Sequence, residues 1–399
     1  METIWRDNLA EYSGTTRTGG NVNIRYKKNS KSKKQVYIDY SLLFMTIFMV
    51  AFGLVMLYSA SAYECQIEYH GDSAYYLRKQ LTAVVFGVIG IVVVMFLGYR
   101  FFKHPVIATL VYWGSNFIAL LVLTPLGVDA NGAKRWINVG MSVQVCEVVK
   151  VGVIVYMAYY LNKYGKKIVK FKDWIKVLIV IAIPAGIIAG ITKDLSSAVV
   201  IVGIAGIMLL IVGKDIRCLL GLMAAAIVGG SIFIATASFR MERVKVWLHP
   251  EKYQKEGGFQ VLQALYAIGS GGLFGKGIGK GVQKLGYVPE SQNDMIFTVI
   301  CEELGIVGAL AVILMFVFIV YRLWLIAMNS QDLFGALLTI GVMAHISVQT
   351  VINLAVVTSI FPNTGVPLPF MSYGGTSIMG LLVEMGMVFS VSKRNISAK

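Results

Sequence analysis

Long apolar runs alternate with short polar segments along most of this chain. A helix rises about 1.5 Å per residue, so a run of roughly 20 apolar residues crosses the hydrocarbon of a bilayer. Such runs lie near residues 38–61, 79–99, 105–124, 143–162, 174–192, 196–213, 216–238, 294–322, 333–357 and 370–392. The pattern predicts an all-α polytopic membrane protein with about ten transmembrane helices.

Lys and Arg gather in alternate connecting segments, which predicts the orientation of the helices. Short loops on the cytoplasmic side of a membrane are enriched in these residues. The basic segments are 100–103, 163–172, 214–217 and 393–394. Both termini are therefore expected in the cytoplasm, with a large extracytoplasmic loop, residues 239–293, between helices 7 and 8.

The same pattern divides the chain into three parts. Residues 1–36 are polar and basic and predict a disordered cytoplasmic arm, residues 37–392 form the transmembrane domain, and residues 393–399 form a cytoplasmic tail. In a soluble protein, the net charge of +15 would suggest binding to nucleic acid. Here 57% of the residues are hydrophobic and 14% are charged, which indicates a protein embedded in a bilayer, so no nucleic-acid partner is expected. The four scattered cysteines predict neither a disulfide framework nor a zinc site.

The predicted outer loop carries more cations than its side of the membrane favours, among them Arg243 and Lys284. These cations fit an anionic ligand such as a pyrophosphate, or a solvated loop that rests on anionic head groups. The run Gly269–Gly281 matches no nucleotide-binding spacing. It predicts either a backbone that offers N–H groups to an anion or a linker without a ligand.

Asp294 directly precedes the eighth apolar run, at the outer membrane boundary. A carboxylate there interacts favourably with a helix dipole, or serves as a partly desolvated general base or metal ligand. Glu147 and Lys150 lie at i and i+3 inside an apolar helix and are expected to face each other or a polar cavity. His345, Gln349 and Asn353 form a polar stripe, for which helix packing is favoured over a substrate path.

Several ordered motifs of this chain resemble the SEDS family of shape, elongation, division and sporulation proteins, typified by RodA, FtsW and SpoVE. The resemblance covers residues 38–392. Its strongest stretches are Gly132–Trp136, Gln260–Gln263, Gly269–Gly272, Val282–Glu290 with Asp294, and Pro362–Ser377.

This resemblance implies a peptidoglycan glycosyltransferase in the bacterial cell membrane that polymerises lipid II at its outer face during division, elongation or sporulation. It implies a class B penicillin-binding protein as partner, with divisome or elongasome components, and no organic cofactor. Asp294 matches the essential acid of the family, which would deprotonate the acceptor hydroxyl or hold a divalent cation, Mg or Mn; inversion at the sugar carbon would follow. The resemblance assigns substrate binding to Lys134, Arg135, Trp136, Glu147, Lys150, Arg243, Gln260, Gln263, Lys284, Glu290 and Ser372.

The chain departs from the family pattern at two places and leaves two other functions open. The usual QPSE appears as Gln144-Val-Cys-Glu147 and the usual TDFIF as Asn293-Asp-Met-Ile-Phe297. A lipid II flippase would use charges within the membrane, such as Glu147, Lys150 and His345, although transporter sites usually lie at the bilayer midplane and the densest motif lies in outer loops. A scaffold for a penicillin-binding protein would use the outer motifs as binding surface.

Overall fold

The computed structural model describes residues 35–130, 133–138, 140–165, 171–212, 224, 229–231 and 238–396. The chain divides into a main unit, Tyr37–Arg394, and a terminal unit made of Met1–Val36 and Asn395–Lys399. Strands β1 (Gln35–Tyr37) and β5 (Arg394–Ile396) pair with each other. The predicted arm lies almost wholly outside the described residues.

Nine helices among the described residues are long and apolar enough to span a membrane. They comprise α2 (Tyr40–Glu68), α3 (Tyr75–Leu97), α4 (Pro105–Leu120), α5 (Val145–Tyr164), α6 (Phe171–Gly186, continued by a π-helical turn to Ile191), α7 (Leu195–Val212), α11 (Ile296–Met328), α12 (Leu333–Val357) and α13 (Gly375–Ser392). The all-α multi-pass prediction is confirmed, and nine of the predicted spans correspond to these helices. The predicted seventh span, 216–238, lies almost entirely outside the described residues.

The interior of the main unit is built around α12, which packs against α5, α7, α11 and α13, while α13 also packs along α3. The spanning segments of α5, α12 and α13 are mostly buried, whereas most of α3 and α11 faces outward. Buried polar side chains can lie on the three interior helices because neighbouring helices supply their hydrogen-bond partners.

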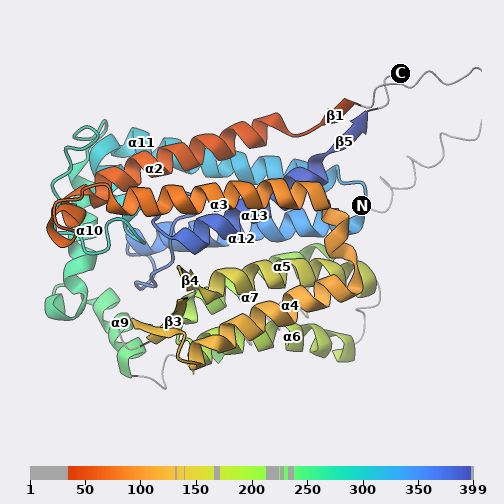
Figure 1. Cartoon of the computed structure of the whole chain (residues 1–399). Helices are drawn as coiled ribbons and strands as arrows, with labels where there is room; N and C mark the ends of the chain where they lie inside the picture. Colours follow the sequence, from red (N-terminus) through yellow and green to blue (C-terminus); the bar gives the residue numbers. More distant parts are fainter. Residues whose placement is uncertain are drawn as a thin grey trace, which may run out of the picture. The chain divides into compact units, whose positions relative to one another are not determined.

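One end of the bundle, called the site end below, carries elements that the hydropathy pattern did not predict (Figure 1). A three-stranded antiparallel sheet of β2 (Gly127–Ala130), β3 (Ala133–Asn138) and β4 (Ser142–Gln144) leads into α5. Segment 239–293, expected as one loop, contains α9 (Ser238–Leu248) and α10 (Gly258–Ser270) before a long connection to α11. Two short helices without membrane-spanning length are invisible to a search for apolar runs.

The connection from α10 to α11 is held against α11 at a kink. Gly305 has φ 67°, and the amides of Ile306 and Val307 donate to the carbonyl oxygens of Gly272 and Leu273 at 2.9 and 3.1 Å. Glycine adopts this conformation without the penalty of a Cβ atom. The glycine-rich run is therefore a fixed part of the site end.

Candidate functional site

Asp294 lies at the last turn before α11 and is 7% exposed. Its Oδ1 atom is buried without a hydrogen-bond partner, while its backbone carbonyl accepts from Asn353 Nδ2 of α12 at 2.8 Å. The preceding turn reverses at Glu290, whose φ of 56° is in the left-handed region, and the Asn293 amide donates to its carbonyl at 3.0 Å. The local backbone thus presents a buried carboxylate with one oxygen that accepts no hydrogen bond from the protein.

The pKa of Asp294 is raised to about 7, mainly by burial and also by the negative charge of Glu290, while a hydrogen bond from its own backbone and the charge of Arg243 partly offset these effects. Removing a carboxylate from water disfavours its charged form, and a neighbouring carboxylate acts in the same direction. A group with this pKa exchanges a proton near neutral pH, which is the property required of a general base.

Two arginines line one cavity of about 510 Å³. Asp294 is not among its lining residues, but the lining residue Thr364 directly precedes Gly365, whose Cβ position lies 3.9 Å from Asp294 Oδ2. Arg135 of β3 donates to the carbonyl of Lys193 at 3.2 Å, and its Nε is buried without a partner. Arg243 of α9 donates to the carbonyl of Asn363 at 3.3 Å, and loss of water contact together with Arg135 lowers its pKa. The positive charge of Arg135 disfavours the charged form of Arg243, and an anion bound in the cavity would offset this effect.

The wall of this cavity continues to Asp294 through the loop 358–374. Asn363 Nδ2 donates to Gln260 Oε1 of α10 at 2.8 Å, and Gln260 Nε2 donates to the Pro289 carbonyl at 3.3 Å. A Cβ atom on Gly365 would lie 3.9 Å from Asp294 Oδ2. Gln260 thus joins the segment before Asp294 to the arginine cavity, which makes it a positioning contact for both.

Glu147 and Lys150 form the buried pair that their spacing predicts. Lys150 Nζ lies 2.8 Å from Glu147 and also donates to Gln349 Oε1 of α12 at 2.8 Å, and both charged side chains are at most 3% exposed. His345 contacts Gln349 Oε1 and Glu384 of α13, each at 2.8 Å. The stripe on α12 joins helices by hydrogen bonds, as the packing interpretation of His345 predicts.

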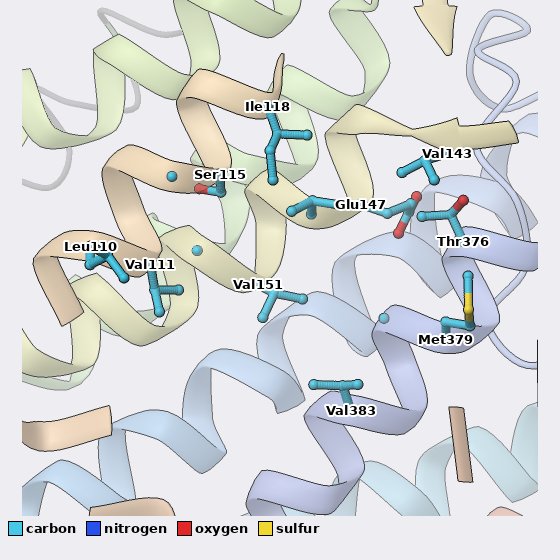
Figure 2. Close-up of a pocket in the computed structure, with 14 residues that line it drawn as sticks. Leu110, Val111, Ser115, Ile118, Val143, Glu147, Val151, Thr376, Met379 and Val383 are labelled. Atoms are coloured by element: carbon cyan, nitrogen blue, oxygen red, sulfur yellow. The ribbon is translucent and has the colours of Figure 1, made fainter. Parts of the chain in front are cut away.

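An apolar groove of about 430 Å³ runs between α4, α5 and α13, with Glu147 at one end. Figure 2 shows Leu110 and Val111 of α4, Val151 of α5 and Val383 of α13 along its length, and Glu147 beside Thr376. Gly114 lines the groove, and a Cβ atom there would meet nothing within 4 Å. The groove is an apolar channel along transmembrane helices, suited to a lipid chain.

The glycine-rich connection binds carboxylates of the protein itself. The amides of Gly279 and Gly281 donate to Glu303 at 3.1 and 3.4 Å, and those of Val282 and Gln283 donate to Glu302. Lys284, expected to bind substrate, is 6% exposed, and its Nζ lies 2.6 Å from Glu303. The backbone does offer N–H groups to an anion, but that anion is internal, and Lys284 is held in a buried ion pair.

The remaining residues of the sequence-based set occupy different surroundings. Lys134 is exposed on β3, and Trp136 is half-buried between β2 and β4. Gln263 lies one turn after Gln260 on α10, and Glu290 is exposed beside Asp294. The Ser372 hydroxyl accepts from the Leu368 amide at 2.8 Å and closes a turn of the loop 358–374. Ser372 is thus occupied in shaping the loop.

Three residues near the arginine cavity were not singled out from the sequence. Asp194 accepts from the amide and hydroxyl of Ser197 at the start of α7, and Ser196 donates to the Thr364 carbonyl at 2.7 Å. Asn363 lies within the stretch Pro362–Ser377, for which the resemblance assigns a role only to Ser372. The sequence does contain a pattern that points to Asp194, because the charged residues Lys193 and Asp194 interrupt two adjacent apolar runs.

A divalent cation fits Asp294 only with help from a ligand. No group of three or more His, Cys, Asp or Glu that could hold a metal occurs in the described part of the chain. Asp294 has a buried oxygen without a hydrogen-bond partner, and the charge of Glu290 raises the pKa of Asp294, which shows that the two carboxylates interact. Mg²⁺ commonly uses one or two carboxylates and completes its shell with water and substrate phosphates, so this pair is compatible with such an ion.

Comparison with known proteins agrees with this architecture. The family model described as cell cycle protein, FtsW/RodA/SpoVE, matches residues 40–396. A probable peptidoglycan glycosyltransferase FtsW of Trichlorobacter lovleyi is 36% identical over 357 residues, which cover 89% of this chain and 93% of that protein. Stage V sporulation protein E of Bacillus subtilis is 34% identical over 362 residues, covering 90% and 98%.

Solved structures show the same fold. A chain from a peptidoglycan synthase complex that coordinates polymerization and crosslinking has a TM-score of 0.74 and 26% identity, covering 89% of this chain and 97% of that one. Rod shape determining protein RodA of Thermus thermophilus has a TM-score of 0.65 and 26% identity, covering 89% and 96%. The fold and site define a multi-pass membrane protein with a buried acid beside an arginine cavity. The chain belongs to the FtsW/RodA/SpoVE family.

Proposed function

We propose that this protein is a peptidoglycan glycosyltransferase that polymerises lipid II at the outer face of the bacterial cell membrane. The observation that carries the proposal is Asp294, a buried carboxylate with a free oxygen and a pKa of about 7 beside a cavity with two arginines. The names of the relatives, probable peptidoglycan glycosyltransferase FtsW, support this reaction class.

Asp294 acts as the general base. It accepts the proton of the acceptor hydroxyl as that oxygen attacks the anomeric carbon of a sugar whose leaving group is a lipid pyrophosphate. Direct displacement inverts that carbon. A base with a pKa near the working pH is ionised in a useful fraction of molecules and still accepts a proton readily.

Arg135 and Arg243 stabilise the leaving pyrophosphate. Charge-assisted hydrogen bonds from guanidinium groups to phosphate oxygens are strong, and Arg135 has a buried Nε without a partner. The charge that develops on the leaving group also relieves the repulsion between the two arginines. In the alternative in which Asp294 holds a divalent cation together with Glu290, that ion would neutralise pyrophosphate charge.

The apolar groove between α4, α5 and α13 receives part of the polyprenyl chain. Its lining is almost entirely apolar, and its mixed end at Glu147 and Thr376 lies where β4 leads into α5. The lipid would remain in the plane of the membrane while the sugar and pyrophosphate reach the site end.

A class B penicillin-binding protein is the proposed partner, within division, elongation or sporulation machinery. A structural neighbour comes from a synthase complex that joins polymerization to crosslinking, and relatives are named FtsW, SpoVE and RodA. The flippase alternative is disfavoured because the charges it would use are buried in pairs: Glu147 with Lys150 and His345 with Glu384.

The test compares the parent with Asp294→Asn, each with its penicillin-binding partner and a divalent cation, on fluorescent lipid II in detergent. Glycan length is read on a gel. We expect long glycan from the parent and at least a hundredfold loss in the variant, the usual scale for a general base. If folded parent makes no glycan while its liposomes move lipid II across the bilayer, the flippase replaces the polymerase. Absence of both activities would favour the scaffold.

A further inference from the structure

Two amide side chains on α12 hold consecutive carbonyl groups of the loop 358–374. Asn353 Nδ2 donates to the Val366 carbonyl at 2.8 Å, and Gln349 Nε2 donates to the Pro367 carbonyl at 2.9 Å. Gly365, the next residue back along the loop, adjoins the carboxylate of Asp294. The position of the loop against the general base therefore depends on the orientation of these two amides.

The orientation of Gln349 is set by its other end. Its Oε1 accepts from Lys150 Nζ and lies 2.8 Å from His345 Nε2. The reversed amide would place its NH₂ group against the Lys150 ammonium and its oxygen against the Pro367 carbonyl. Because an amide oxygen only accepts, His345 must carry a hydrogen on Nε2.

Glu384 fixes the other ring nitrogen of His345. The Nδ1 atom lies 2.8 and 3.0 Å from the two carboxyl oxygens of Glu384, and both side chains are at most 1% exposed. With a hydrogen on Nε2, a hydrogen bond between Nδ1 and Glu384 requires one further proton, which either partner can carry. Either placement of that proton leaves the pair neutral and keeps Nε2–H directed at Gln349.

We propose that His345, oriented by Glu384, is a positioning residue of the transfer reaction: its Nε2–H fixes Gln349, and Gln349 fixes the loop that borders Asp294. The hydrogen bonds lead from Glu384 on α13 through His345 and Gln349 on α12 to the loop, and none of these three side chains is placed in contact with substrate. This inference rests on the proposed function, which gives Asp294 its role as the base.

A purely structural role would be served equally well by apolar side chains. Replacing a buried ionic pair by apolar residues of similar volume is often neutral or stabilising, whereas removing one partner leaves an unpaired polar group. The double variant His345→Leu/Glu384→Leu therefore keeps the helices packed and removes the hydrogen bond to Gln349 together with the His345–Glu384 pair. The variant Glu384→Gln keeps that bond, because its NH₂ group donates to Nδ1 of the neutral ring.

The experiment measures lipid II polymerisation, thermal stability and hydrogen exchange of segment 358–374 in the parent and both variants. In the double variant we expect kcat to fall about tenfold with KM little changed, since small misplacements of reacting groups have effects of at least this size. If the displaced loop lets water reach Asp294, the pKa of that carboxyl falls and the acid limb of the pH profile moves to lower pH. Hydrogen exchange of the amides in segment 358–374 becomes faster. Glu384→Gln stays within about threefold of the parent in kcat because Nε2–H remains.

Thr350→Val, which alters a buried hydroxyl on α12 without a hydrogen-bond partner, is the matched control and should leave all three readings unchanged. Parent values of kcat, pH profile and loop exchange in a folded double variant would overturn the inference. A loss of kcat in Glu384→Gln as large as in the double variant would also overturn the inference. The charge of Glu384, and not the Nε2–H group of His345, would then be the property that matters. If the parent makes no glycan, the proposed function fails, while loop exchange still decides whether His345 holds the loop.

Discussion

Asn353 Nδ2 lies 2.8 Å from the backbone carbonyl oxygen of Asp294 and 2.8 Å from that of Val366. One amide on α12 thus joins the segment that carries the acid to the loop that borders it. Because both bonds go to main-chain atoms, the carboxylate itself stays available to substrate. The site is assembled from segments that are far apart in sequence, and α12 sets the spacing between them.

The pH dependence of polymerisation follows from Asp294. Its pKa is about 7, and the base must be ionised, so kcat/KM is expected to fall about tenfold per pH unit below that value. Arg243 lowers the pKa of Asp294, so Arg243→Gln should raise that pKa and move the acid limb to higher pH. A pH–rate series with lipid II measures both. An acid limb that stays in place or moves to lower pH in Arg243→Gln would contradict the electrostatic coupling between Arg243 and Asp294.

The same carboxylate should reduce the stability of the protein as pH rises from acidic values to neutrality and above. Because the folded pKa is raised, the neutral acid is favoured in the fold, and the cost of ionising it grows as pH rises from about 4 to about 7. Asp294→Asn removes that cost, which is up to about 4 kcal/mol at pH 8 and less than half of that at pH 5. Melting temperatures in detergent at the two pH values test this expectation.

Glu251→Gln, at an exposed carboxylate between α9 and α10, is the control and should show no such difference. An inactive Asp294→Asn variant that melts higher than the parent at pH 8 would also show that its inactivity is not a folding defect. A variant that melts lower at both pH values would mean that the carboxylate has a favourable partner in the fold.

The sequence predicts some of these features and misses others for physical reasons. Apolar runs reveal the spanning helices because lipid requires every backbone group to be satisfied within a helix. The i, i+3 spacing of Glu147 and Lys150 predicts their pairing because both residues lie on one helix. In the sequence, Lys284 looks like a solvent-exposed cation of a loop. Its ion pair with Glu303 forms only when the chain folds. Long-range contacts of this kind leave no local pattern.

The glycine-rich connection provides a packing test. A Cβ atom on Gly271 would lie 1.9 Å from the Cys301 carbonyl oxygen, whereas one on Gly269 would meet nothing within 4 Å. Gly271→Ala should therefore lower the free energy of unfolding by about 1–3 kcal/mol, the range for overpacked sites, and Gly269→Ala should not. Thermal unfolding in detergent compares them. Equal stability of the two variants would show that the connection moves away from α11 easily.

The groove between α4, α5 and α13 gives the last prediction. Gly114 has open space above it inside the groove, so Gly114→Leu should fill part of the path of the polyprenyl chain. We expect KM for lipid II to rise at least about fivefold with kcat little changed, because loss of ground-state contacts acts on binding. Gly206→Leu, on α7 and away from the groove lining, also enters open space and is the matched control. A lipid II analogue with a short prenyl chain separates the explanations: if the groove holds the distal chain, the parent and Gly114→Leu should use the analogue equally well. An unchanged KM for full-length lipid II would place the chain elsewhere on the bundle.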